Sequence, residues 1–121
     1  MEFKSDIPIY IQIATDIKEQ ILNGTLKAGD KLPSIREYSV EYEVSPLTMQ
    51  RAIQFLDIEE MIYSKKGIGS FVKEGTREEL EKKMVEVTIR EFILKMRNCG
   101  MSDFAILDRV EKSLRDEGRK G

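Results

Sequence analysis

The chain has 121 residues, of which 40% are apolar and 35% charged, and its 20 basic and 22 acidic side chains give a formal net charge of −2. This composition indicates a soluble, helix-rich chain with one small domain, or one domain and an appendage, and it excludes a disordered chain. The chain has no histidine, which excludes His-dependent catalytic triads, imidazole general bases and His-ligated metals.

The sequence also indicates where the protein works. No uncharged apolar run is long enough to span a bilayer, and Met1–Asp6 lacks the hydrophobic core of a secretory leader. Cys99 is the only cysteine, as expected in a reducing compartment, so we predict a cytoplasmic protein. Acidic residues outnumber basic ones over residues 1–75. Binding to nucleic acid would therefore depend on where a few cations lie.

Apolar residues at helical spacing predict three helices in the first half of the chain. The first begins at Pro8 and ends at Asn23-Gly24, where glycine allows a left-handed turn. A capping box at Ser34–Glu37 starts a short second helix. After a tight turn, Ser45-Pro46 starts the third with a serine N-cap. The expected inward residues are Ile9, Ile13, Ile17 and Ile21, with Tyr10, Ala14 and Leu22 widening the stripe, then Ile35, Tyr38, Ser39 and Tyr42, then Met49, Ala52, Ile53 and Leu56. At the beginning of the third helix, the residues expected to face outward are Leu47, Thr48, Gln50 and Arg51.

Two short β-like segments follow the third helix. Ile62–Ser64 and Ser70–Val72 are joined by Lys65–Gly69, whose two glycines indicate a hairpin. Three helices and a two-stranded ribbon in this order predict a winged helix-turn-helix, a mainly α (α+β) fold. We expect this domain to occupy residues 1–75, with its boundary at Glu74-Gly75.

The remaining residues, 76–121, predict a two-helix segment. Thr76–Glu79 has the pattern of a second capping box, and the helix that it starts is expected to run to about Arg97. Ser102 is the expected N-cap of the last helix, and the polar end over residues 115–121 is expected to fray.

Two short helices cannot bury both of their apolar faces alone. They either fold onto the winged domain or pair with a second copy of the chain, and the second alternative predicts a homodimer. The residues expected at that interface are Leu80, Met84, Val87, Phe92, Met96, Phe104, Leu107, Val110 and Leu114.

Several motifs follow one another in a fixed order: Pro8-Ile9-Tyr10 with Gln12-Ile13, Gly29–Glu37, Ser45–Thr48 with Arg51-Ala52, and Lys66–Val72. Together they resemble the amino-terminal domain of GntR-type bacterial transcription regulators, over roughly residues 7–73. The short remainder is similar to the YtrA-type subfamily, in which a small tail pairs two protomers. The resemblance implies a sequence-specific DNA-binding regulator.

The resemblance also implies which residues contact DNA. At the start of the second helix, Ser34 and Arg36 match positions that meet the DNA backbone or a base edge. Wing residues, which reach toward the minor groove, are Lys66, Gly67 and Gly69. Lys65 is added to them because it forms an adjacent basic pair with Lys66 at the hairpin tip. Recognition-helix residues, which enter the major groove, are Ser45, Leu47, Thr48, Gln50 and Arg51.

This chain departs from the family pattern at five positions. Leu47 stands where Asn is common, which removes one polar contact. Glu43 and Glu60 stand where Gly is common, so each must hold a turn without it. Tyr38 and Tyr42 replace small aliphatic residues, which predicts a bulkier packing face.

Side-chain chemistry gives the recognition residues specific partners. Arg51 can bind O6 and N7 of a guanine, Gln50 can bind N6 and N7 of an adenine, and Leu47 can touch a thymine methyl. Each assignment has a structural alternative. Gln50 and Arg51 could merely solvate the outer face of the third helix. Capping alone is enough to explain Ser34 and Ser45. Lys65 and Lys66 could be the basic residues of an ordinary hairpin tip.

The sequence thus predicts a cytoplasmic homodimeric transcription regulator, a repressor that occupies an inverted-repeat operator. An alternative is a winged-helix protein-interaction adaptor that binds no DNA, with its acidic surface meeting a basic partner. The sequence shows no nucleophile–base pair and no metal cluster, so we predict neither an enzyme nor a cofactor. An unidentified small-molecule effector would be compatible with this prediction, and we expect no membrane partner.

Overall fold

The computed structural model of the chain describes the backbone of residues 1–120 and the side chains of residues 1–118. It divides into two compact units, Met1–Glu81 and Lys82–Gly121. Among the described residues, no helix combines the length and the apolar character needed to cross a membrane.

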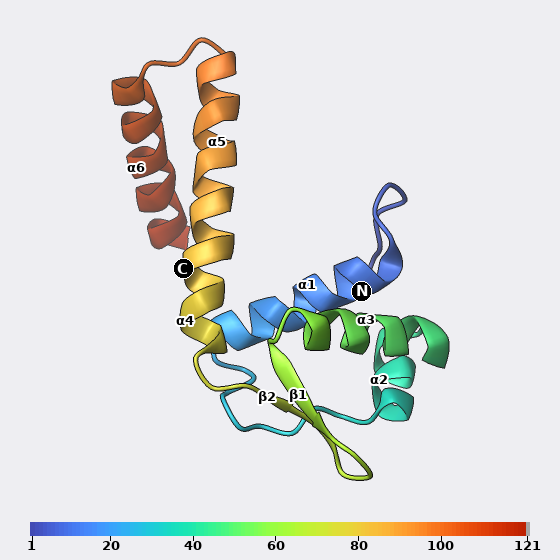
Figure 1. The fold of residues 1–121 in the computed structure, drawn as a ribbon. Helices are drawn as coiled ribbons and strands as arrows, with labels where there is room; N and C mark the ends of the chain where they lie inside the picture. Colours follow the sequence, from blue (N-terminus) through green and yellow to red (C-terminus); the bar gives the residue numbers. More distant parts are fainter. Residues whose placement is uncertain (121) are drawn as a thin grey trace. The chain divides into compact units, whose positions relative to one another are not determined.

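Three helices form the body of the first unit: α1 (Ile9–Leu22), α2 (Ile35–Tyr42) and α3 (Pro46–Ile58) (Figure 1). Both α1 and α2 pack against α3. The residues of α1 and α3 that are at most 2% exposed are Ile13, Ala14, Ile17, Ile21, Met49, Ala52 and Leu56. The predicted inward faces are therefore confirmed for these residues, whereas Ile9 was expected inside and is exposed.

Side-chain caps start α2 and α3 as the sequence predicts. At the start of α2, the Glu37 N–H donates to Ser34 Oγ over 3.1 Å and the Ser34 N–H donates to Glu37 Oε1 over 3.2 Å. At the start of α3, the Thr48 N–H donates to Ser45 Oγ over 3.1 Å. These bonds satisfy backbone donors that have no partner within the helix.

The wing is an antiparallel hairpin of β1 (Ile62–Lys65) and β2 (Gly69–Val72), and it projects from the helical body (Figure 1). The link between α1 and α2 runs along the free edge of β2. There the Leu32 N–H donates to Ser70 O over 2.8 Å, and the Val72 N–H donates to Asp30 O over 2.9 Å. The predicted fold class, a mainly α chain with a winged helix-turn-helix, is confirmed.

The first unit continues past residue 75, because α4 (Thr76–Leu80) packs against α1. The predicted capping box at Thr76 is wrong, since the helix has no side-chain cap. Instead, the buried Thr76 hydroxyl donates to Met61 O over 3.1 Å. Arg77 Nε donates to Leu22 O at the end of α1, over 3.1 Å. The assignment of separate functions to residues 1–75 and 76–121 stays a prediction.

A π-helical turn, η1 (Glu81–Val85), leads to α5 (Glu86–Asn98), which the sequence expected as part of one continuous helix. In the second unit, α5 and α6 (Asp103–Lys120) form a helical hairpin (Figure 1). The predicted fraying is wrong for residues 115–120, which are helical, and residue 121 lies outside the described part.

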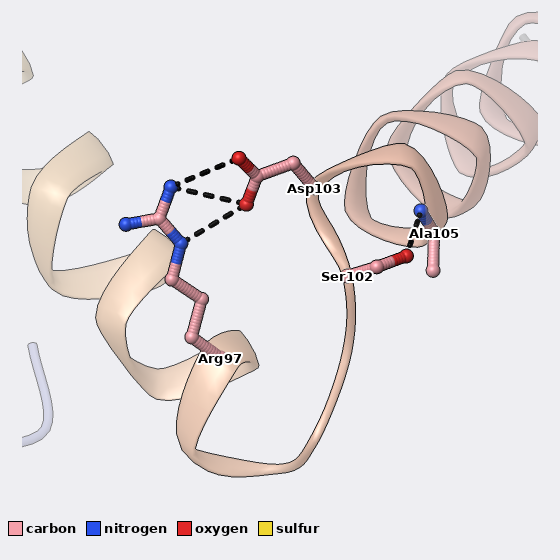
Figure 2. Close-up of polar contacts among 4 residues, drawn as sticks. All are labelled: Arg97, Ser102, Asp103 and Ala105. Carbon is pink, nitrogen blue, oxygen red and sulfur yellow. Dashed lines mark hydrogen bonds and ion pairs between the residues drawn. The ribbon is translucent and has the colours of Figure 1, made fainter.

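Polar contacts hold the turn between α5 and α6 (Figure 2). The Arg97 guanidinium binds both carboxylate oxygens of Asp103, with Nε 3.0 Å from Oδ1 and Nη2 3.2 Å from Oδ2. Ser102 Oγ accepts the Ala105 N–H over 3.1 Å, which confirms Ser102 as the N-cap.

Candidate nucleic-acid interface

The first turns of α3 present the predicted recognition residues in two ways. Leu47, Gln50 and Arg51 lie on the exposed face, with Leu47 66% exposed. Ser45 and Thr48 are tied into the cap, because their hydroxyl oxygens lie 2.9 Å apart and Ser45 Oγ also accepts the Thr48 N–H. The side chains of Leu47, Gln50 and Arg51 are therefore accessible, whereas those of Ser45 and Thr48 fix the start of the helix.

Arg51 is held in place by an aromatic side chain. Its Cζ atom lies 5.9 Å from the ring centroid of Tyr10, which belongs to α1. The Tyr10 ring in turn meets Phe55 edge-on, with centroids 6.1 Å apart and an interplanar angle of 72°. Sequence reasoning placed Tyr10 only on the apolar stripe of the first helix and missed this contact.

The start of α2 offers a hydroxyl and a cation. Ser34 Oγ accepts the Glu37 N–H, so its own hydroxyl hydrogen remains free to donate to a phosphate. Hydrogen bonds from the backbone and side chain of Ser34 lower the pKa of Glu37, with a smaller contribution from Lys31. Glu37 is therefore ionised at neutral pH and engaged in the cap. Arg36 is exposed on the same turn.

The two wing lysines lie in different environments. Lys65 Nζ lies 5.1 Å from the Phe71 ring and 5.9 Å from the Tyr63 ring, and the two rings stack with centroids 5.5 Å apart. Lys66 is exposed next to Gly67, at the turn that joins β1 to β2. Lys65 is thus fixed on one face of the wing, while Lys66 is the cation at its tip.

The two glycines of the wing, Gly67 and Gly69, are required for different structural reasons. Gly67 has φ +78° and no atom within 4 Å of where a Cβ would lie, so the turn needs glycine for its backbone conformation. Gly69 has φ +143°, and a Cβ there would lie 2.8 Å from Lys31 Cε. Lys31 therefore passes close to the wing, a placement that sequence reasoning missed because the residue belongs to the link before α2.

The start of α2 and the wing segment line one groove, which has a volume of about 490 Å³. Its lining includes Ser34 and Glu37 of α2, Ile53 of α3, and Ile68 and Gly69 of the wing segment. The α2, α3 and wing residues predicted to bind DNA thus all belong to the first compact unit.

Four cations of this surface lie outside the ion pairs formed by the described side chains. Among the described side chains, no salt bridge includes Arg36, Arg51, Lys65 or Lys66. Several cations elsewhere in the chain are paired. Their ion pairs are Lys18–Glu59 (2.7 Å), Arg77–Glu81 (2.9 Å) and Arg97–Asp103 (3.0 Å). Arg36, Arg51, Lys65 and Lys66 therefore carry positive charges that are not engaged in ion pairs with the described side chains.

Most residues predicted for dimerisation lie on the surface of the second unit. Val87, Phe92, Phe104, Leu107, Val110 and Leu114 are exposed, and Met84 and Met96 are half-buried. Leu80 differs, because it is 2% exposed and belongs to α4 in the first unit. Exposed apolar residues that the sequence prediction did not include are Val85, Ile89 and Leu94.

Two bacterial relatives resemble the chain over most of its length. The uncharacterized HTH-type transcriptional regulator YhcF of Bacillus subtilis (strain 168) is 30% identical over 112 residues, which is 91% of this chain and 93% of YhcF. The HTH-type transcriptional repressor YtrA of the same organism is 32% identical over 101 residues, covering 81% of this chain and 78% of YtrA. The second match confirms the resemblance to YtrA-type regulators.

Solved structures show the same fold. A GntR family transcriptional regulator from Listeria monocytogenes superposes with a TM-score of 0.87 at 38% identity, covering 91% of this chain and 98% of that one. AraR(DBD) in complex with operator ORX1 matches with a TM-score of 0.55 at 29% identity, covering 59% of this chain and 92% of that one.

The sequence model of bacterial regulatory proteins of the gntR family matches residues 9–72, which include α1, α2, α3 and the wing. The relatives with which the chain shares this region are transcriptional regulators, not enzymes. The chain therefore belongs to the GntR family and is a DNA-binding transcriptional regulator.

Proposed function

We propose that the chain represses transcription as a cytoplasmic homodimer that occupies an inverted-repeat operator. The observation that carries the proposal is a set of cations on α2, α3 and the wing that form no ion pair with any side chain described in the structure: Arg36, Arg51, Lys65 and Lys66. We infer repression rather than activation because the relative YtrA is named a repressor.

In this proposal α3 enters the major groove with its exposed face toward the base edges. Gln50 and Arg51 make the polar contacts to bases, and Leu47 meets a thymine methyl. The free hydroxyl hydrogen of Ser34 and the Arg36 guanidinium bind phosphates. Lys66 extends from the wing toward the minor groove, where a narrow groove concentrates negative potential.

The second unit supplies the proposed dimer contact. Its hairpin exposes Phe104, Leu107 and Leu114 of α6 at 78%, 71% and 68%. Large apolar side chains gathered on a helical hairpin favour burial against a partner. A second copy also doubles the phosphate contacts, which a chain with net charge −2 needs at physiological salt. Modulation by a small molecule stays a prediction without an assigned site.

Selection of bound duplexes from a random pool tests the proposal. We expect two inverted half-sites with centres about one helical turn, or a multiple of it, apart. Replacing Arg51 with alanine should weaken binding to the selected duplex by about 1–3 kcal/mol and relax the preference at one base pair. Equal affinity of the wild-type protein for selected and random duplexes would refute the proposal.

Light scattering combined with gel filtration tests the dimer. The wild-type chain should have the mass of two copies, and Leu107→Glu should shift it to one copy and weaken operator binding. Arg109→Gln, an exposed polar residue of the same helix, should leave both properties unchanged. A wild-type protein that remains monomeric at high concentration would contradict the dimer assignment.

A further inference from the structure

We propose that Tyr10 is a positioning residue for DNA recognition, which holds the Arg51 guanidinium in the place from which it meets DNA. This inference rests on the proposed function, in which Arg51 contacts the operator. It adds a role for α1, a helix to which that function gives no DNA contact.

A ladder of side chains leads to Arg51 along the interface between α1 and α3. It starts at Glu59, whose carboxylate binds Lys18 Nζ over 2.7 Å. Lys18 Nζ lies 5.3 Å from the Phe55 ring centroid, and the Phe55 ring meets Tyr10 at 6.1 Å. Tyr10 then faces the Arg51 Cζ atom at 5.9 Å. The ladder alternates between the two helices at every step.

Helical spacing explains why these five residues form one continuous row. Arg51, Phe55 and Glu59 are four residues apart along α3 and its C-cap, so they lie on one face. Tyr10 and Lys18 flank Ala14 on α1, and Ala14 is completely buried against the body of the unit. Because α1 and α3 pack against each other, Tyr10 and Lys18 come within reach of the row on α3.

An aromatic ring can position a cation without neutralising it. A carboxylate at the same place would bind the guanidinium and cancel the charge that attracts DNA, whereas the ring face attracts the cation and leaves its N–H donors available. Fixing the long arginine side chain before binding also lowers the conformational entropy lost when DNA is bound.

The wing shows the same arrangement independently. Lys65 lies over the stacked rings of Tyr63 and Phe71 and is in no salt bridge with a described side chain. Two cations of the candidate DNA surface are therefore held by rings, each on a different element. The Tyr10 contact differs in that its ring comes from another helix, so it links the orientation of Arg51 to the packing of α1 on α3.

A double-mutant cycle tests the inference, with the selected operator duplex and a random duplex as probes. Tyr10→Leu should weaken operator binding about two- to fivefold, the range expected for a cation–π contact at an exposed site. Tyr10→Phe keeps the ring and should bind like the wild type. In the Arg51→Ala background, Tyr10→Leu should cause no further loss. Side-chain Nε–H chemical shifts of Arg51 in the free protein should change in Tyr10→Leu and remain in Tyr10→Phe.

Two results would contradict this inference without affecting the proposed function. It fails if Tyr10→Leu weakens binding equally with and without Arg51, or if Tyr10→Phe is as harmful as Tyr10→Leu. If Tyr10→Leu does not fold, Tyr10→Met takes its place in the cycle, because methionine fills the half-buried site with a flexible apolar side chain. If the wild-type protein does not prefer the selected duplex over the random one, the proposed function and this inference both fail. If it does prefer the selected duplex but the effects of the Tyr10 and Arg51 substitutions are independent, only this inference fails.

Discussion

At the scale of single residues, two glutamates hold the chain in a left-handed backbone conformation. Glu43, the C-cap of α2, has φ 57°, and Glu60, just after α3, has φ 59°. For a residue with a Cβ this conformation costs about 1 kcal/mol relative to its preferred backbone regions, and glycine avoids that cost. The resemblance to GntR regulators, in which glycine is common at both places, predicted that these turns would be strained.

Replacing either glutamate with glycine should therefore stabilise the protein. Glu43→Gly and Glu60→Gly should each raise the free energy of unfolding by about 1 kcal/mol and the thermal midpoint by about 4 °C, measured by circular dichroism. Glu41→Gly is the matched control, since Glu41 is an exposed residue inside α2. This control should lower stability by up to about 1 kcal/mol. A fall in the midpoint for Glu43→Gly would show that its side chain has a stabilising role.

Two tyrosines of α2 make the first unit sensitive to alkaline pH. Burial raises the pKa of Tyr38 to about 12, with smaller contributions from Glu41 and Asp16. Burial also raises the pKa of Tyr42, whose hydroxyl donates to Asp16 Oδ2 over 2.6 Å. Both shifts favour the protonated phenol in the folded state, relative to the ordinary value of 10.0.

The sign of these shifts sets the pH window. Their contribution to stability is complete below pH 10 and declines as the pH rises toward the folded-state pKa of Tyr38, about 12. In a spectrophotometric titration, the phenolate absorbance of these two residues should appear together with the loss of helical signal. Tyr38→Phe should remove part of this late absorbance. Complete ionisation of all four tyrosines near pH 10, with the helices intact, would contradict the prediction.

The candidate site shows what residue patterns can and cannot predict. Helical periodicity placed Leu47, Thr48, Gln50 and Arg51 on the outer face of α3. The structure confirms that placement for all of them except Thr48, which is half-buried and bound to Ser45 in the cap. Helical periodicity could not predict that the Tyr10 ring lies against Arg51. Its position depends on which turn of α1 packs against which turn of α3, and that register is set by the tertiary core.

At the scale of elements, helix caps that depend on local bonds were predicted correctly, whereas α4 begins where the sequence predicts a helix but without the predicted cap. The capping box at Ser34 closes within four residues, so its sequence pattern is sufficient. Thr76 has the same pattern, but its hydroxyl binds Met61 O, fifteen residues earlier in the chain. A buried long-range acceptor competes with the local cap, and sequence spacing does not reveal it.

Thr76→Val should therefore destabilise the docking of α4. It keeps the side-chain shape and removes the hydrogen bond to Met61 O, at an expected cost of about 1 kcal/mol in urea unfolding. Thr88→Val is the control, because the exposed Thr88 hydroxyl of α5 donates to Met84 O only four residues earlier, in η1, and its effect should stay within about 0.5 kcal/mol. Equal effects of the two variants would show that the bond to Met61 does not fasten α4.

At the scale of the whole molecule, the two units differ in how they bury apolar residues. The first unit has a core shared by three helices and the wing, whereas Ile106, 7% exposed, is the only buried side chain among residues 82–118. The sequence predicted this imbalance, since two amphipathic helices leave more apolar surface than they can cover. It could not assign Leu80 correctly, because the same apolar stripe crosses from α4 into η1 and α5.

The proposed dimer sets how strongly operator binding depends on salt. Each lysine that neutralises a phosphate releases counterions, so the slope of log affinity against log salt becomes less steep by about 1 for each such contact removed. Lys66 occurs twice in a dimer, and Lys66→Ala should therefore reduce the slope by about 2 in a fluorescence-anisotropy titration. Lys112→Ala should not change it, because Lys112 pairs with Asp108 on α6, 3.0 Å away. A change of about 1 would indicate that one wing engages the duplex, and an unchanged slope would remove Lys66 from the DNA interface.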